Sequence, residues 1–318
     1  MGCFSIIKYT LKTNIITNIK GNIMNNINIE SDYENKYNPD IVGHILTNSN
    51  IEIIREIPSR GKFQHALFDF DGTLSLIREG WQSVMAQLML EALSETPYVE
   101  NETELKIFID NLIQKTTGKQ TIYQMIDLES EVEKRGGTPL SAQEYKSEYT
   151  SRLMKKIDYR RRALQSGEMK PIDMLVNGSF ELLETLKSKN IKLYLASGTD
   201  EHFVKEESNL LDVAKYFDGR IYGALEDHKK FSKAMVIEKI LKENNIDGSL
   251  LLGFGDGFVE IDNTKNVGGT GIGVAIDEKK LNGTIDPLKR KRLLGVGADI
   301  IISDYSNTEE LVSYLMEP

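Results

Sequence analysis

Apolar residues are spaced in two ways along the chain, and the two spacings alternate. Short apolar runs, typical of buried strands, lie at 63–68, 191–196, 250–254, 271–276 and 299–302. Between some of these runs, apolar side chains recur every three or four residues, which predicts helices over 180–189 and 233–244. Buried strands that alternate with helices form parallel sheets covered on both faces. The pattern therefore predicts an α/β fold with a Rossmann-like, doubly wound parallel sheet.

A long helical stretch interrupts this alternation after the first strand. Its apolar positions predict helices over 81–93, 105–113, 122–133 and 142–164, with no convincing strand between them. Helices inserted after the first strand of such a sheet are typical of a cap domain. We therefore predict a helical cap over 78–173, inserted into a core made of residues 59–77 and 174–318.

Residues 1–58 are predicted to form an N-terminal extension of different composition. Asn and Lys interrupt each of its Ile-rich runs, which argues against a secretory signal. The apolar positions of residues 40–57 predict a short helix and then a strand, both packed on the core. Cys3 is the single cysteine, which excludes an internal disulfide or a cysteine-based zinc cluster and favours a cytoplasmic location.

The charge balance narrows the possible partners. The chain has 39 basic and 48 acidic residues and a formal net charge of −9, which argues against a general nucleic-acid surface. No apolar stretch approaches the roughly 18 residues of a membrane-spanning helix, so no membrane partner is expected. An anionic small molecule stays possible, because a local site can oppose the overall charge.

Chemically useful side chains follow three of the predicted strands. Ligands of open α/β sheets bind beyond the carboxyl ends of the strands. At these ends lie Asp69 and Asp71, then Ser197 and Gly198, and then Asp256 and Glu260; Lys233 begins a helix directly after Ser232. Clustered carboxylates are stable together when a cation joins them, and Mg²⁺ prefers oxygen ligands. One carboxylate can attack phosphorus while another transfers protons, so this set favours phosphoryl transfer.

The motifs resemble those of the haloacid dehalogenase-like (HAD) hydrolases. Residues 69–74 read Asp-Phe-Asp-Gly-Thr-Leu, as in the first motif of that superfamily, while Ser197 and residues 255–260 resemble its second and fourth motifs. The helical insert is similar to the C1-type cap of the phosphoglycolate-phosphatase-like branch. The resemblance implies that Asp69 is the nucleophile and Asp71 the general acid and base.

The resemblance also implies roles for other residues. Asp256 would complete a Mg²⁺ site with Asp69 and the Asp71 carbonyl, and Glu260 would hold a metal-bound water or orient a lysine. Ser197 would bind phosphate, with Thr73, Gly198 and the lysine as further candidates for phosphate contacts. Lys233 is favoured as this lysine by its place at a helix start, 23 residues before Asp256, and Lys230 stays the alternative.

The cap offers weaker candidates for substrate contacts. Lys119 and Gln120 belong to a segment that interrupts the cap helices, and such a segment can reach over the site. Arg160 begins a run of three arginines that either closes over an anion or forms a solvated helix face. Trp81 follows the first motif and either lines the pocket or packs the hinge into the cap; packing is the favoured interpretation.

These observations converge on one expected function and two alternatives. The expected function is a Mg²⁺-dependent phosphatase that hydrolyses a small phosphorylated metabolite, such as a sugar phosphate, through an aspartyl phosphate. A phosphomutase of the β-phosphoglucomutase type would use the same two aspartates, and a catalytically silent binding protein would keep the fold alone. A monomer or a homodimer is expected.

Overall fold

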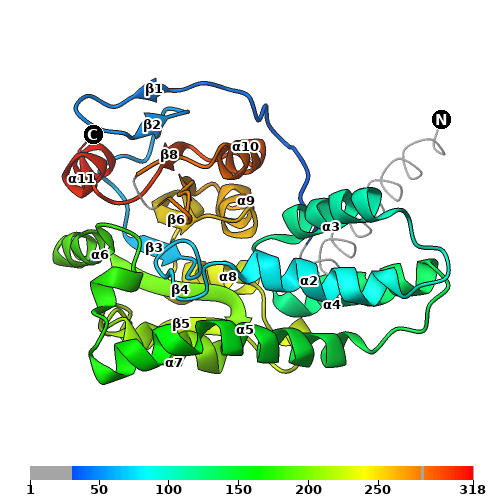
Figure 1. Cartoon of the computed structure of the whole chain (residues 1–318). Helices are drawn as coiled ribbons and strands as arrows, with labels where there is room; N and C mark the ends of the chain where they lie inside the picture. Colours follow the sequence, from blue (N-terminus) through cyan, green and yellow to red (C-terminus); the bar gives the residue numbers. More distant parts are fainter. Residues whose placement is uncertain (1–30, 281–282, 318) are drawn as a thin grey trace, which may run out of the picture.

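The computed structural model describes residues 31–280 and 283–317, and within them eight strands form one sheet. The strand order is β1-β2-β8-β7-β6-β3-β4-β5, and the six strands from β8 to β5 are parallel (Figure 1). The strand bounds are β1 (His44–Ile45), β2 (Glu52–Ile53), β3 (His65–Phe68), β4 (Lys192–Asp200), β5 (Ile221–Ala224), β6 (Leu251–Gly255), β7 (Thr270–Val274) and β8 (Ile300–Ile302). The predicted doubly wound parallel α/β fold is confirmed, with an antiparallel pair added at one edge.

The register of the central strands brings the polar strand ends together. Phe68, the last residue of β3, pairs with Leu195 of β4 on one side and with Phe254 of β6 on the other. Parallel strands in this register end at the same edge of the sheet. The residues that follow them in sequence therefore converge on one place, beside the centre of the sheet.

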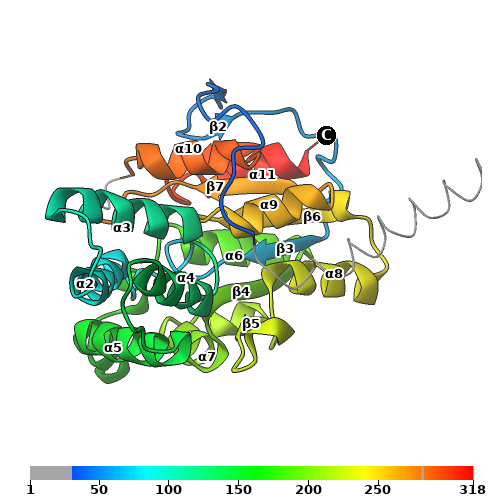
Figure 2. The same cartoon turned by 90° about the vertical axis from the view of Figure 1, so that its right-hand side faces the viewer.

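Helices cover both faces of the sheet. In Figures 1 and 2, α8, α9 and α10 lie on one face, and α6, α7 and α11 lie on the other. Their bounds are α6 (Ser179–Ser188), α7 (Glu201–Leu210), α8 (Lys233–Asn244), α9 (Val259–Asn266), α10 (Pro287–Gly295) and α11 (Thr308–Met316). No helix of the residues described here is long and apolar enough to cross a membrane.

The predicted helical insert contains four helices, which we call the cap. They are α2 (Trp81–Ser94), α3 (Glu102–Thr116), α4 (Thr121–Lys134) and α5 (Ala142–Ser166), all between β3 and β4 in sequence. The apolar positions that predicted them are buried, as Met85, Ile109, Leu128 and Ile157 illustrate. Figure 2 shows the cap beside the edge of the sheet where the strands end. The exact domain boundaries stay a prediction.

The predicted N-terminal extension is only partly described, since residues 1–30, including Cys3, lie outside the described residues. The short helix expected within residues 40–57 is wrong, because this stretch forms the two strands β1 and β2 instead. Val42 and Ile45 are 80% and 60% exposed, so they do not form the buried face that a packed helix would need. Glu52 and Ile53 of β2 instead pair with Ile301 and Ile300 of β8.

Buried His65 at the start of β3 makes stability depend on pH. Burial first, and then the charges of Lys192 and Arg220, lower its pKa to about 4. In the unfolded chain the imidazole takes up its proton near pH 6.5, whereas in the folded protein it does so only near pH 4. The free energy of unfolding therefore decreases as pH falls from about 6.5 to 4. We expect His65→Gln, which removes this titration, to lose about 2 kcal/mol less stability between pH 7 and pH 4.5 than the wild type. Urea unfolding at both pH values measures the difference, and equal losses would contradict it.

Candidate active site

The carboxyl ends of β3, β4 and β6 meet the cap around a cavity of about 80 Å³. Its wall combines the predicted polar residues of the core with side chains of α2, α5 and the segment between α3 and α4. The lining residues are Asp69, Asp71, Arg78, Trp81, Thr117, Gly118, Lys119, Thr121, Gln124, Tyr149, Leu153, Ser197, Gly198, Thr199, Lys233 and Asp256. The cavity is thus lined by six of the core residues that the sequence predicted for the site: Asp69, Asp71, Ser197, Gly198, Lys233 and Asp256.

Lys233 lies between two carboxylates at the base of the site. Its Nζ is 2.9 Å from Asp69 Oδ1 and 2.7 Å from Glu260 Oε2, and all three side chains are buried. Burial alone lowers the pKa of Lys233, but the charges of Asp69 and Glu260 raise it above its usual value. Burial raises the pKa of Asp69, and the lysine charge opposes that effect. The Lys233 ammonium is therefore held charged beside Asp69.

Lys230, the alternative lysine, lies elsewhere. It ends a short 3-10 helix (His228–Lys230), its side chain is 74% exposed, and it pairs with Asp227. Lys233 is positioned because Ser232 caps α8, its Oγ accepting a hydrogen bond from Met235 N at 3.1 Å. The geometry therefore favours Lys233 over Lys230.

Asp71 faces the cavity from the loop after β3. Thr199 Oγ1 donates a hydrogen bond of 2.8 Å to Asp71 Oδ2, and Ser197 Oγ lies 3.4 Å from the same oxygen. Burial raises the pKa of Asp71 to about 6, although the charge of Arg78 opposes the increase. A carboxyl group with such a pKa can both donate and accept a proton near neutral pH.

A buried ion pair between Arg78 and Glu207, which the sequence did not predict, lies beside Asp71. Arg78 donates to both oxygens of Glu207, over 2.9 and 2.8 Å, and its Nε lies 3.8 Å from Asp71 Oδ1. Glu207 lies on α7, 129 residues further along the chain, so no local motif could have linked the two. The pair holds a cation beside Asp71 Oδ1.

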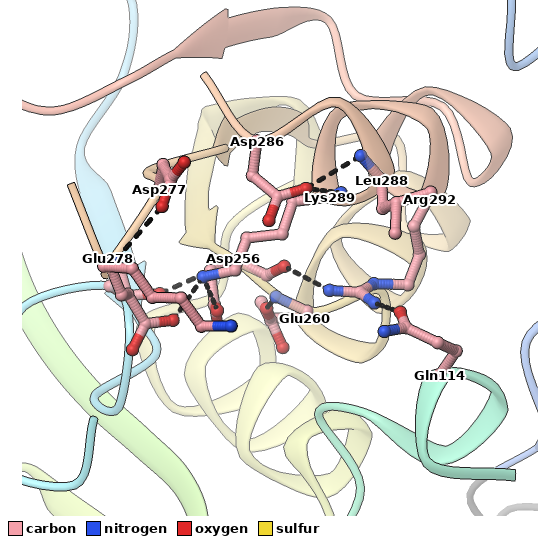
Figure 3. Close-up of polar contacts among 12 residues, drawn as sticks. Gln114, Asp256, Glu260, Asp277, Glu278, Asp286, Leu288, Lys289 and Arg292 are labelled. Atoms are coloured by element: carbon pink, nitrogen blue, oxygen red, sulfur yellow. Dashed lines mark hydrogen bonds and ion pairs between the residues drawn. The ribbon is translucent and has the colours of Figure 1, made fainter. Parts of the chain in front are cut away.

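Asp256 is held by a second polar network, shown in Figure 3. Lys289 Nζ lies 2.7 Å from Asp256 Oδ2 and 2.5 Å from Glu278 Oε1, and it points between the two carboxylates. Asp256 N donates to Thr73 Oγ1 at 3.0 Å. Thr73 is fully buried and does not line the cavity, so its position suits an anchor for Asp256 better than the predicted phosphate contact. Glu278 and Lys289, the latter on α10, went unpredicted because neither belongs to the motifs at the ends of β3, β4 and β6.

The acidic residues of the site suit a metal ion. Carboxylate oxygens of Asp69, Asp256 and Glu260 lie within 4.8 Å of one another, and Mg²⁺ prefers such ligands. Both Glu260 oxygens have protein partners, however, since Oε2 binds Lys233 and Oε1 accepts from Gly257 N at 2.8 Å. Asp69 and Asp256 would therefore be the better ligands, and the contact between Glu260 and Lys233 fits the orientation of a lysine, one of the two predicted roles of Glu260.

The cap candidates differ in position. Lys119 lines the cavity, whereas Gln120 is fully buried beside it and donates to the Phe231 carbonyl at 2.8 Å. Arg160 does not line the cavity: it donates to the Ile77 and Glu79 carbonyls at the start of the cap and pairs with the Glu79 carboxylate at 2.8 Å. Closure of Arg160 over a substrate is thus not the arrangement in this structure. Trp81, expected to pack the hinge, lies in the cavity wall.

Solved structures share this fold at low sequence identity. A β-phosphoglucomutase from Clostridium difficile is 16% identical, with 80% of this chain and 100% of that chain covered and a TM-score of 0.53. A predicted phosphatase from Clostridium acetobutylicum is 18% identical, with 80% and 99% covered and a TM-score of 0.51. A HAD hydrolase of family IA, variant 3, from Entamoeba histolytica is 21% identical, with the same coverage and TM-score. At these identities the likeness concerns the fold.

The sequence comparisons decide the family. No curated protein matches the chain. The family model of the haloacid dehalogenase-like hydrolases matches residues 63–268, a span that runs from β3 through the cap to the end of α9 and covers more than half of the chain. The chain therefore belongs to the haloacid dehalogenase-like hydrolase family.

Proposed function

We propose that this protein is a Mg²⁺-dependent phosphatase that hydrolyses a small phosphorylated metabolite through an aspartyl phosphate on Asp69. The proposal rests on one observation: two aspartates with different surroundings, Asp69 and Asp71, line the same cavity. Asp69 is buried and bound to the Lys233 ammonium, whereas Asp71, two residues on, faces the same cavity and has a pKa raised to about 6. A nucleophile and a separate proton carrier are what phosphoester hydrolysis by covalent catalysis requires.

The first half of the reaction forms the aspartyl phosphate. A carboxylate oxygen of Asp69 attacks phosphorus while the bond from phosphorus to the leaving oxygen breaks, and Asp71 gives its proton to that oxygen. Ser197 and Lys233 line the cavity and would bind the phosphoryl oxygens. Asp69, Asp256 and the Asp71 carbonyl would hold Mg²⁺, whose positive charge offsets that of the phosphoryl group.

The second half returns Asp69 to its starting state. Asp71 accepts a proton from water, the water oxygen bonds to phosphorus, and the bond between phosphorus and Asp69 breaks. The cap limits which molecules can react, because the cavity beneath it measures about 80 Å³ and is walled by Lys119, Tyr149 and Leu153. A small phosphate monoester suits this space when the cap moves aside, whereas a phosphorylated protein segment does not.

A screen of small phosphate monoesters, with free phosphate as the readout, tests the proposal. We expect release from at least one sugar phosphate or similar compound, loss of release with a chelator, and recovery when Mg²⁺ is added. Isomerisation of a sugar phosphate with little free phosphate would instead identify a phosphomutase, since both activities use the two aspartates. Absence of both activities across the screen would favour a binding protein that keeps only the fold.

A further inference from the structure

Residues 32–37, which we call the strap, cross from the cap to the core ahead of the family domain. At the cap, Asp32 Oδ1 lies 2.5 Å from Lys119 Nζ, and Oδ2 lies 2.5 Å from Lys115 Nζ. Tyr33 N also donates to the Lys115 carbonyl at 3.1 Å, in the last turn of α3. The strap therefore binds the end of α3 and the segment that follows it by a main-chain hydrogen bond and two ion pairs.

The other end of the strap is bound to the core. The Tyr33 ring meets the Phe258 ring edge to face, with 5.5 Å between their centroids. Lys36 Nζ lies 2.6 Å from Asp262 Oδ1 on α9, and the main-chain N–H groups of Lys36 and Tyr37 donate to the Gly295 carbonyl. These contacts place the strap on the helix that follows the Asp256 turn.

The cap segment that the strap holds is the one that closes the cavity. Residues 117–120, the cap loop, lie between α3 and α4. A Cβ atom on Gly198 would stand 2.6 Å from the Lys119 carbonyl oxygen, and one on Gly257 would stand 3.0 Å from Gly118 Cα. The cap loop is thus packed against the two turns that carry Ser197 and Asp256. Because the cavity beneath it measures only about 80 Å³, admitting a substrate larger than this space would require the loop to move away.

We propose that the strap is a latch that holds the cap loop closed over the site, with Asp32 as its positioning residue. Asp32 suits this role because one of its two lysines belongs to the cavity wall and the other does not. The Lys119 side chain is 5% exposed and lines the cavity, whereas the Lys115 side chain is 53% exposed on the outer surface. One carboxylate thereby couples the cap loop to the end of α3, and the rest of the strap couples both to the core.

The strength of these ion pairs suits a latch that must open. Asp32 is 40% exposed, so water and salt weaken its two pairs, and such pairs shift equilibria by small factors. Removing both should increase the population of the open cap loop by about threefold to tenfold. A role of loop opening in catalysis rests on the proposed phosphatase function. The contacts that hold the loop closed do not depend on that proposal.

Hydrogen–deuterium exchange of the full chain tests the latch without any substrate. We expect Asp32→Asn to accelerate exchange of the amides at 115–121 by about threefold to tenfold. The matched control is Asp40→Asn, which removes an exposed ion pair to Lys291 on α10 from the same N-terminal region; no ion pair described for Asp40 involves the cap. Equal exchange at 115–121 in the wild type and both variants would overturn the proposal.

The effect of salt on exchange in the wild type provides a second measurement, which needs no variant. In the wild type, 1 M NaCl should accelerate exchange at 115–121, because it screens partly exposed ion pairs, while β3 stays protected. The same salt should have little further effect in Asp32→Asn. No acceleration in the wild type would also overturn the latch. Neither measurement uses phosphate release, so failure of the proposed function would be seen separately in the substrate screen.

Discussion

Asp69→Asn should reduce phosphate release by at least about 10⁴-fold, the scale on which removal of a catalytic nucleophile acts. An amide is nearly the same size as a carboxylate, but it carries no charge and is a poor nucleophile toward phosphorus. Lys233 keeps Glu260 as a partner in this variant, 2.7 Å from its ammonium, so the buried lysine stays paired. The loss should therefore be in kcat, with the fold intact. Steady-state phosphate release and circular dichroism measure the two quantities.

The matched control for this experiment is Asp299→Asn. Asp299 is also a buried aspartate paired with a lysine, Lys265, at 2.7 Å, but it precedes β8 at the opposite end of the sheet. The control variant should lose stability and keep its activity per folded molecule. Turnover of Asp69→Asn within tenfold of the wild type would show that Asp69 is not the nucleophile.

Lys233→Met should lower kcat by about 10²- to 10³-fold, whereas Lys230→Met should leave it nearly unchanged. Lys233 is the cation nearest the Asp69 carboxylate, at 2.9 Å, and its loss leaves the charge of the transferring phosphoryl group less well balanced. Lys230 is largely exposed and contacts neither Asp69 nor Glu260 through any described ion pair. Methionine keeps much of the lysine volume in both variants, so the comparison isolates the charge.

Stability should separate the two lysines as well. Removing one partner of a buried ion pair typically costs about 3–5 kcal/mol, because a carboxylate is left buried without its counter-charge. Urea unfolding should therefore detect a large loss for Lys233→Met and almost none for Lys230→Met. Adding Glu260→Gln to Lys233→Met should recover part of this stability but not the activity. A larger loss of kcat in Lys230→Met than in Lys233→Met would reverse the assignment.

The sequence predicted the parts of the fold that depend on local spacing. The strand before Asp69 and the four cap helices were predicted within a few residues, because each buries a continuous face that its own apolar pattern reveals. Helices α7, α9, α10 and α11 and strand β5, none of them longer than ten residues, were not placed. The helix expected within residues 40–57 failed because Val42 and Ile45 are exposed and the residues around them form β1, which pairs with β2.

Sequence alone determined which chemical groups stand at the strand ends, because a parallel sheet brings the residues after its strands to one edge. Asp69, Asp71, Ser197 and Asp256 could be named for this reason. Only the tertiary structure shows that Lys233 is buried beside Asp69, whereas Lys230, three residues earlier, is exposed and pairs with Asp227.

The partners of the site residues were likewise decided by tertiary structure. Glu207 beside Arg78, Lys289 beside Asp256 and Asp32 beside Lys119 each come from an element distant in sequence. An ion pair of this kind depends on how helices and loops pack in three dimensions, and neither residue carries a local signal of its partner. The strap could not be recognised from the sequence for the same reason. Its residues form no motif, and only the fold shows that Asp32 contacts Lys119 of the cap loop.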